Sequence, residues 1–280
     1  MVLTVQAALV DARARLAAIS ESASSDGQAL LGHVLRVNRA WLLTYPETML
    51  TDEQALAYET LLARAAGGEP LPYVLGRWAF YDRDFLVTPA VLIPRPETEL
   101  LLDAALTWVG DRALTVVDVG TGSGAIAVTL AALRPRACVY AIDVNTEALA
   151  VARQNAGRYQ ADVTFFEGDL LAPLIERSIQ PDLVVANLPY IPSDEVDRLT
   201  VSRHEPRLAL DGGADGLALI RRLIGQASHW TPLPTMLLEI MSGQGETVQK
   251  WAEDFLPGAQ VTVGLDYAGH QRIVRLERRS

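Results

Sequence analysis

The chain has 280 residues, of which half are hydrophobic, and a formal net charge of −10. This length and composition suffice to bury a full core in one large domain or two modest ones, and the negative charge argues against broad affinity for nucleic-acid backbones. The apolar runs are far shorter than the roughly 20 residues that span a bilayer, and the amino terminus lacks the basic start of a signal peptide, so we expect a cytoplasmic protein without a membrane partner.

Residues 1–66 carry the signals of a small helical domain. Apolar residues recur at helical spacing in two segments, the second of which follows a potential cap at Asp26. A capping box formed by Thr51 and Gln54 then precedes a third helix, which ends at Gly67. Because this domain is separate from the rest of the chain, we expect it to be a docking surface for a folded protein substrate.

Residues 67–96 form a linker of different character. Two runs of alternating aromatic and β-branched residues flank Tyr81, Asp82 and Arg83 and predict a β-hairpin, and a proline-rich loop follows. The segment IPRPETE at its end stops one element and begins a helix, with Pro96 in the first turn.

From residue 97 to residue 280 strands and helices alternate. The expected elements are helix 97–109, strand 115–120, helix 125–133, strand 138–143, helix 146–156, and strands 163–169 and 182–188. Continuous apolar strands separated by helices predict an α/β domain with a mostly parallel sheet covered on both faces. Such sheets bind ligands at the carboxyl ends of their strands.

A glycine-rich loop follows the first of these strands. Its residues are Gly120, Thr121, Gly122, Ser123 and Gly124. Glycines let the backbone turn sharply and approach a ligand at a helix amino terminus, so the loop indicates a nucleoside cofactor, although it also fits a dinucleotide pattern. Neither a hydrolase nucleophile elbow nor a phosphate-binding P-loop is present in the sequence.

Three further strand ends carry polar groups. Asp143 ends the second strand and can accept both hydroxyls of a ribose, although an acid at this spacing also serves NAD. Asp169, followed by Leu170, ends the third strand, where an adenine amino group would lie. The fourth strand ends at Asn187, and the tetrapeptide Asn187-Leu188-Pro189-Tyr190 places a neutral amide there. Taken alone, such a tetrapeptide is explained by an ordinary turn. Because three other strand ends also carry ligand-type groups, we favour a functional role for it.

Cysteine and histidine are too few and too scattered for a metal site. Cys138 is the single cysteine, and its place in an apolar run predicts a small core residue. The four histidines are His33, His204, His229 and His270. We therefore expect neither a metal nor a disulfide.

Taken together, these motifs resemble those of the HemK/PrmC family of protein-glutamine N5-methyltransferases. The resemblance rests on GTGSG, Asp143, Asp169, the Asn187 tetrapeptide, LIPRPETE at 92–99, HEPRLALDGGADGL at 204–217 and LLEIMSGQGETV. It implies a class I methyltransferase with a Rossmann-like, mostly parallel seven-stranded sheet and an N-terminal helical domain. It also implies S-adenosylmethionine as the cofactor and the Gln of the GGQ motif in class-1 peptide chain release factors as the substrate. The resemblance further implies that the enzyme is a monomer.

The resemblance also implies roles for the site residues. Gly120 to Gly124, Asp143, Asp169, Leu170 and Asn187 would surround the cofactor. Asn187 and the Leu188 carbonyl would accept the two N–H groups of the substrate amide. Pro189 would restrict the conformation of the loop, and the Tyr190 ring would pack against the substrate amide. Two positions depart from the family pattern: Leu188 replaces a proline, and Met241 replaces a glycine.

Several alternatives stay open on the sequence. The same tetrapeptide serves adenine N6-methyltransferases, which need a basic groove and aromatic stacking for a flipped base. A glutamine of a ribosomal protein is a second possible substrate. The remaining alternatives for the function of the chain are an NAD-dependent oxidoreductase and a catalytically silent binding module. The loop residues Glu205 and Arg207 either contact the substrate or brace the loop as an ion pair.

Overall fold

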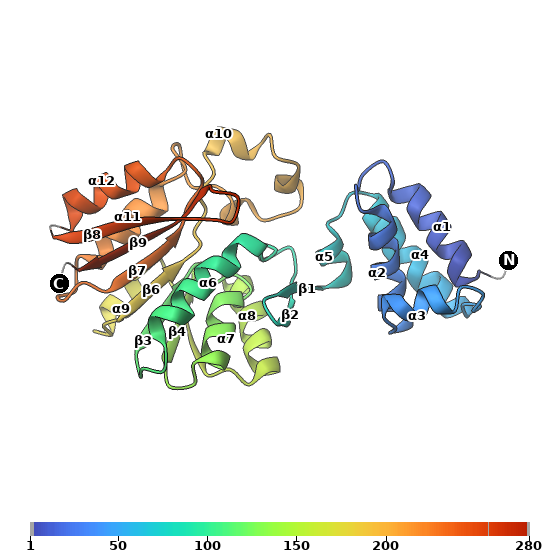
Figure 1. Cartoon of the computed structure of the whole chain (residues 1–280), viewed down its shortest axis with the longest axis horizontal. Helices are drawn as coiled ribbons and strands as arrows, with labels where there is room; N and C mark the ends of the chain where they lie inside the picture. Colours follow the sequence, from blue (N-terminus) through green and yellow to red (C-terminus); the bar gives the residue numbers. More distant parts are fainter. Residues whose placement is uncertain (1–2, 257, 279–280) are drawn as a thin grey trace. The chain divides into compact units, whose positions relative to one another are not determined.

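The computed structural model describes residues 3–256 and 258–278. These residues form two compact units, which divide between Arg77 and Trp78. The first unit is helical and the second is an α/β unit, as the sequence predicts (Figure 1). The division falls after Arg77, so a short helix within the segment expected to be a linker is counted with the helical unit.

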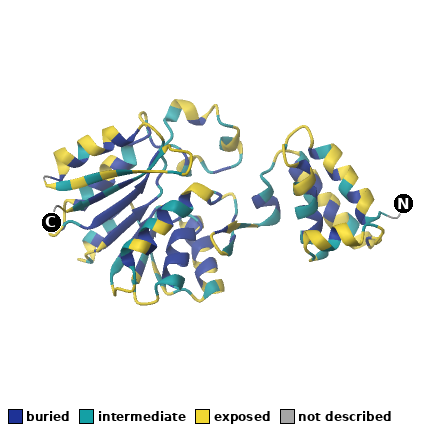
Figure 2. Cartoon of the chain, viewed as in Figure 1, coloured by how far each residue is buried: buried dark blue, intermediate teal, exposed yellow. Residues whose placement is uncertain are grey.

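Within the described residues of the first unit, from residue 3 to residue 77, five helices surround one apolar core. They are α1 (Val5–Leu16), α2 (Ala23–Leu35), α3 (Arg39–Thr44), α4 (Asp52–Ala66) and α5 (Leu71–Leu75). Each longer helix turns its apolar stripe inward, as the buried faces in Figure 2 show. Tyr58 of α4 is almost fully buried in this core, and its hydroxyl donates a hydrogen bond to the Ala8 carbonyl at 3.2 Å.

The ends of these helices agree only partly with the sequence analysis. The capping box of Thr51 and Gln54 is present, with both reciprocal hydrogen bonds. Asp26, by contrast, is not a cap: α2 begins at Ala23, and Asp26 lies inside the helix, where it accepts hydrogen bonds from the hydroxyls of Ser20 and Ser22. The serines preceding the helix therefore satisfy a carboxylate that looked like a cap in the sequence.

A two-stranded hairpin, β1 (Arg77–Phe80) and β2 (Arg83–Leu86), confirms the turn expected around Tyr81. Its two phenylalanines, Phe80 and Phe85, are buried against the α/β unit.

The α/β unit is built on a seven-stranded sheet with the order β5-β4-β3-β6-β7-β9-β8. The strands are β3 (Thr115–Val119), β4 (Cys138–Asp143), β5 (Val163–Glu167), β6 (Leu183–Ala186), β7 (Thr235–Glu239), β8 (Ala259–Leu265) and β9 (Gln271–Arg278). The first five strands in this order pair in parallel, and β9 runs antiparallel between β7 and β8. This arrangement confirms the predicted fold class.

Helices cover both faces of the sheet (Figure 1). On one face lie α6 (Pro96–Val109), α7 (Ala125–Leu133) and α8 (Thr146–Tyr159), and on the other lie α9 (Ala172–Glu176), α11 (Ala218–Ala227) and α12 (Gly245–Phe255). Successive residues of β3 alternate between the two cores, Val116 facing the first and Val117 the second. The segment between β6 and α11 holds the short helices α10 (Ser193–Val196), η1 (Thr200–Arg203) and η2 (Arg207–Ala209).

Cys138 is exposed, so the expectation that it lies in the core was wrong. It is the first residue of β4, at the amino end of the strand, and the run of apolar residues becomes buried only from Val139 onward. No helix within residues 3–256 and 258–278 has the length and apolar character to cross a membrane, and no metal-binding group of His, Cys, Asp or Glu occurs there.

One buried amide ties the hairpin to the sheet. Asn155 of α8 is fully buried; its Oδ1 accepts from the Leu86 N–H at 2.8 Å, and its Nδ2 donates to the carbonyls of Leu86 at 3.0 Å and Ser123 at 2.8 Å. The same side chain therefore fixes β2 and the glycine-rich loop against one helix.

We predict that Asn155→Ala lowers the free energy of unfolding by roughly 1–3 kcal/mol, because three backbone groups lose their partner. Urea unfolding followed by circular dichroism measures the change. Gln154→Ala, on the exposed side of the same helix, is the matched control and should leave the midpoint unchanged. Equal midpoints for the two variants would contradict this role of Asn155.

Candidate active site

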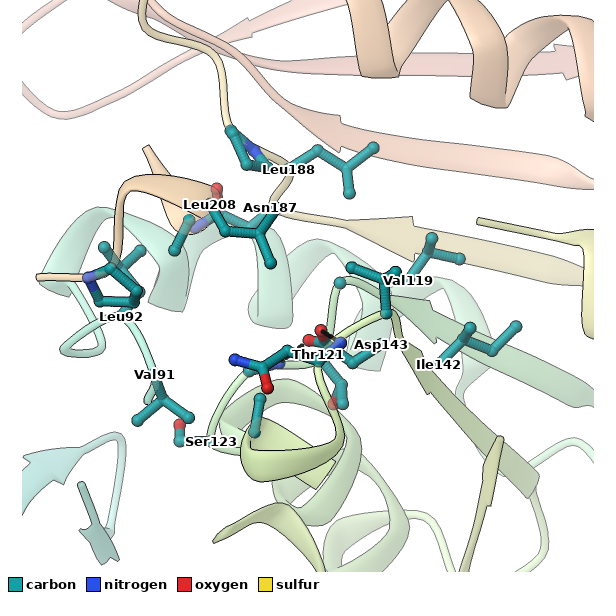
Figure 3. Close-up of a pocket in the computed structure, with 18 of the residues that line it drawn as sticks. Val91, Leu92, Val119, Thr121, Ser123, Ile142, Asp143, Asn187, Leu188 and Leu208 are labelled. Carbon is teal, nitrogen blue, oxygen red and sulfur yellow. Dashed lines mark hydrogen bonds between the residues drawn. The ribbon is translucent and has the colours of Figure 1, made fainter. Parts of the chain in front are cut away.

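A cavity of about 340 Å³ opens at the carboxyl ends of β3, β4, β5 and β6. Figure 3 shows Thr121, Ser123 and Asp143 along one side of it and Asn187 and Leu208 along the opposite side. All four strand ends that the sequence analysis selected contribute lining residues, so the sheet brings these segments to one place.

The glycine-rich loop turns through three left-handed glycines, Gly120, Gly122 and Gly124. A Cβ atom on Gly120 would lie 2.9 Å from Leu188 Cδ2, and one on Gly124 would lie 3.1 Å from Ala152 Cβ. At these two positions the positive φ disfavours other residues, and a Cβ would in addition crowd a neighbouring side chain. Gly122 differs, since no protein atom lies within 4 Å of its would-be Cβ and the residue lines the cavity.

The loop is held from behind by Asp118 of β3, which is buried. The Thr121 hydroxyl donates to Asp118 Oδ2 at 2.6 Å, and the Ala127 N–H donates to the same atom at 3.2 Å. Burial raises the pKa of Asp118 to about 7, partly offset by these two hydrogen bonds. The side chain of Thr121 therefore braces the loop, while the loop backbone is left to face a ligand.

Asp143, at the end of β4, connects the second strand to the glycine loop. Its Oδ2 accepts from the Gly122 N–H at 2.8 Å, and its Oδ1 accepts from the Asn145 N–H at 2.9 Å. Burial raises the pKa of this carboxyl, and the backbone hydrogen bonds oppose that rise. Each oxygen keeps a further lone pair, so the carboxylate can still accept a ribose hydroxyl beside the apolar Ile142 and Val144 of the cavity lining.

The third strand end combines an ion-paired carboxylate with an apolar residue. Asp169 forms an ion pair with Arg222 of α11, so its carboxylate already has a cationic partner at the rim of the cavity. Leu170 has a left-handed backbone and is buried, and it lines the cavity with an apolar surface. A carboxylate with one cationic partner keeps further lone pairs, so Asp169 can still accept a hydrogen bond from a base while Leu170 supplies an apolar surface.

Asn187 presents one free acceptor to the cavity. Its Nδ2 donates to the Thr98 hydroxyl oxygen at 2.8 Å, which leaves Oδ1 without a partner among the described residues. The Leu188 carbonyl likewise accepts no hydrogen bond from the described part of the chain, while the Leu188 side chain is buried against Gly120. The substitution of leucine for proline therefore adds packing to the core and keeps the carbonyl available.

Tyr190 does not line the cavity in the described structure. Its hydroxyl donates to Glu239 Oε1 at 3.2 Å, its carbonyl accepts from Gln244 Nε2 at 2.9 Å, and burial raises its pKa. The apolar residues that line the cavity near Asn187 include Leu92 and Leu208, which sequence reasoning did not select. Pro189, which the sequence analysis did select, lies on the lining.

A second loop packs tightly against the tetrapeptide. A Cβ atom on Gly212 would lie 2.6 Å from the Pro189 carbonyl oxygen, and one on Gly216 would lie 2.3 Å from the Tyr190 carbonyl oxygen. The glycines of DGGADG thus allow two backbones to touch. Met241 causes no strain at its position, because it does not adopt the left-handed conformation and its N–H donates to Gln244 Oε1 at 2.9 Å.

Glu205 and Arg207 have different partners from those considered in the sequence. Glu205 is buried, pairs with Arg95 and accepts from the Ile93 N–H at 3.3 Å, which joins its loop to the IPRPETE segment. Arg207 pairs instead with Asp197 and Asp211. The bracing interpretation holds for both residues, although not as a pair with each other.

Sequence reasoning missed Thr98, which lines the cavity and contacts Asn187, and Glu239, which is the partner of Tyr190. Glu239 is the last residue of the buried strand β7, so the strand-end signal that selected Asp143 could also have selected it. Thr98 gave no such signal, because it sits in the first turn of α6 and is 89 residues from its partner.

Comparison with solved structures supports the fold alone. The catalytic domain of hMettl16, in complex with the MAT2A 3′UTR hairpin 6, matches with a TM-score of 0.58 and 13% identity, covering 85% of this chain and 86% of that one. The ribosomal protein L11 methylase of Lactobacillus delbrueckii subsp. bulgaricus matches with a TM-score of 0.50 and 22% identity over 69% of this chain and 84% of that one.

Sequence comparison is more specific. The PrmC N-terminal domain model matches residues 7–76, and the methyltransferase small domain model matches residues 96–204. The release factor glutamine methyltransferase of Moorella thermoacetica is 42% identical over 99% of both chains. The enzymes of the same name from Bacillus cereus and Vibrio cholerae are 40% and 37% identical, over 90% and 98% of this chain and 91% and 96% of their own lengths. The chain therefore belongs to the release factor glutamine methyltransferase family of S-adenosylmethionine-dependent enzymes.

Proposed function

We propose that this protein transfers a methyl group from S-adenosylmethionine to the side-chain amide nitrogen of the glutamine in the GGQ motif of a class-1 peptide chain release factor. The observation that carries the proposal is Asn187, which lines the cavity and donates from Nδ2 to Thr98, while its Oδ1 has no partner among the described residues. A neutral acceptor in this position suits an amide substrate, because it binds N–H groups and carries no charge that would pair with the cofactor.

The chemistry explains why acceptors are needed. S-adenosylmethionine supplies an electrophilic methyl group on sulfur when bound. A carboxamide nitrogen is a poor nucleophile because its lone pair is delocalised, so the protein must orient it and stabilise the positive charge that develops on it. Asn187 Oδ1 and the Leu188 carbonyl would each accept one N–H of the substrate amide, which would leave the nitrogen lone pair free for the methyl group. As the new C–N bond formed and the C–S bond broke, S-adenosylhomocysteine would leave and the nitrogen would lose one proton to water.

The cavity lining favours a glutamine over a flipped base. Among the described residues that line it, none is aromatic, so the lining offers no ring on which a flipped base could stack. The charged groups on the lining are two arginines, Arg95 and Arg222, and two carboxylates, and both arginines are paired with acids. This surface lacks the excess of positive charge that nucleic-acid binding requires.

The test is tandem mass spectrometry of an intact release factor after incubation with the protein and isotopically labelled S-adenosylmethionine. We expect one labelled methyl on the GGQ glutamine, and none on a release factor in which that glutamine is replaced by glutamate. At saturating cofactor, Asn187→Ala should lower turnover by about 10²–10³-fold, because an oriented acceptor is lost. A methyl group on a ribosomal protein or a nucleic acid instead, or near-normal turnover by Asn187→Ala, would contradict the proposal.

Asp143 is proposed to support cofactor binding in two ways. Its carboxylate accepts hydrogen bonds from the ribose hydroxyls, and it holds the glycine-rich loop through the Gly122 N–H. We predict that Asp143→Ala weakens S-adenosylmethionine binding by roughly 1–3 kcal/mol, measured by isothermal titration calorimetry. Asp162→Ala is the matched control, since this exposed carboxylate precedes β5 at the opposite edge of the sheet. Equal affinities of the two variants would remove Asp143 from the cofactor site.

The helical unit is proposed to dock the release factor, since the cavity and all of its lining belong to the second unit. A variant that begins at Trp78 should bind S-adenosylmethionine as the full chain does, but should methylate an intact release factor with a lower kcat/KM. Its rate on a short GGQ peptide should be unchanged, because the peptide lacks the docking surface. Full activity of a folded truncated variant on the intact protein would place docking elsewhere.

A further inference from the structure

A row of polar side chains leads away from the cavity behind Asn187. Asn187 Nδ2 donates to Thr98 Oγ1 at 2.8 Å, and Thr98 is 5% exposed in the first turn of α6. The Thr98 hydroxyl lies close enough to the carboxyl of Glu239 to lower the pKa of that carboxyl. Glu239 ends β7 and is 1% exposed, and its Oε1 accepts the Tyr190 hydroxyl at 3.2 Å.

The second carboxyl oxygen, Glu239 Oε2, is buried without a hydrogen-bond partner among the described residues. Leaving such a group unpaired costs free energy, so a buried carboxyl at this position is poorly explained by stability. The Thr98 hydroxyl has one hydrogen, and its oxygen already accepts from Asn187. The unused hydrogen therefore lies near a carboxyl group that has an unused acceptor.

The direction of these hydrogen bonds decides which end of the Asn187 amide meets the substrate. A threonine hydroxyl can either accept from Nδ2 or donate to Oδ1 of an asparagine. If it donated to Oδ1, the amide would turn over and present its NH2 group to the cavity. Two NH2 groups would then face each other, and the substrate amide could not be held.

We propose that Glu239 is a positioning residue that acts through Thr98 to fix the orientation of the Asn187 amide. The Thr98 hydroxyl donates its hydrogen bond to the Glu239 carboxylate, and the Thr98 oxygen accepts a hydrogen bond from the Nδ2 of Asn187. The Oδ1 of Asn187 then remains free for the substrate. This inference rests on the proposed function, since it explains how the acceptor for the glutamine amide is kept in place. Neither Glu239 nor Thr98 need touch the reacting atoms.

The charges around Glu239 give the arrangement a pH dependence. Burial, with a smaller contribution from Glu97 of α6, raises the pKa of Glu239 to about 7, against the opposing effects of Thr98, Tyr190 and Arg272 of β9. A carboxyl with a raised pKa is protonated below that value, and a protonated Glu239 can itself donate to the Thr98 oxygen. Turnover should therefore fall as the pH is lowered through about 7.

Thr98→Val is the first test, because valine keeps the shape and removes the hydroxyl. At saturating cofactor and substrate, we expect kcat to fall roughly tenfold or more, since misplacement of a reacting group by about 1 Å can cost about 100-fold. S-adenosylmethionine affinity should be unchanged, and the loss of turnover at low pH should disappear. Thr98→Ser, which restores the hydroxyl, should recover most of the turnover.

Thr129→Val is the matched control. Thr129 lies in α7, is fully buried, and its hydroxyl has no partner among the described residues, so the same chemical change should leave kcat and its pH profile as in the wild type. If Thr98→Val and Thr129→Val have equal turnover, or if Thr98→Val keeps the wild-type pH profile, Glu239 does not act through Thr98.

A measurement without turnover separates this inference from the proposed function. The chain has four asparagines, Asn38, Asn145, Asn155 and Asn187, so labelling with [15N]asparagine gives a simple NMR spectrum of side-chain amides. The Asn187 signals, assigned by their loss in Asn187→Ala, should shift in Thr98→Val and in Glu239→Gln but not in Thr129→Val. Unshifted Asn187 signals would overturn the inference, whereas shifted signals in a protein that methylates no glutamine would overturn the function alone.

Discussion

The carboxyl ends of parallel strands meet at one edge of a sheet, and the site depends on this constraint. Strands β3, β4 and β6 are buried on both faces, so their ends are the places where polar groups can reach a ligand. The glycine loop, Asp143 and Asn187 are far apart in sequence but lie around one cavity for this reason. The hydrophobic cores on both sides make the edge rigid, and rigidity is what catalysis by orientation requires.

The groups around the cavity are held mainly by partners that never face it. Asp118 holds the glycine loop, Asn155 joins that loop to the hairpin, and the DGGADG glycines support the tetrapeptide. These interactions satisfy donors and acceptors of the loops, which would otherwise be able to form other hydrogen bonds. The atoms left without partners, Asn187 Oδ1 and the Leu188 carbonyl, are then the ones available to a substrate amide.

Sequence patterns predicted the parts of the fold that are set by local chemistry. The helix 125–133 and the strand 138–143 were predicted with the bounds that the structure has, because each is one apolar run with clear ends. The short helices α3 and α5 were not predicted, since they are too short to show a period. In the site, the strand-end residues were found, but Thr98 was not, because its role depends on a contact across 89 residues, and the direction in which Tyr190 points is likewise set by tertiary packing.

The central claim is that Asn187 holds the substrate amide through its oxygen. The most direct test is a crystal structure of the protein with S-adenosylhomocysteine and a peptide that contains the GGQ sequence. The account predicts that the glutamine amide nitrogen lies within hydrogen-bonding distance of both Asn187 Oδ1 and the Leu188 carbonyl oxygen, with the sulfur on its remaining side. A glutamine whose amide nitrogen is bound by other groups, with Asn187 Oδ1 facing away from it, would contradict the account.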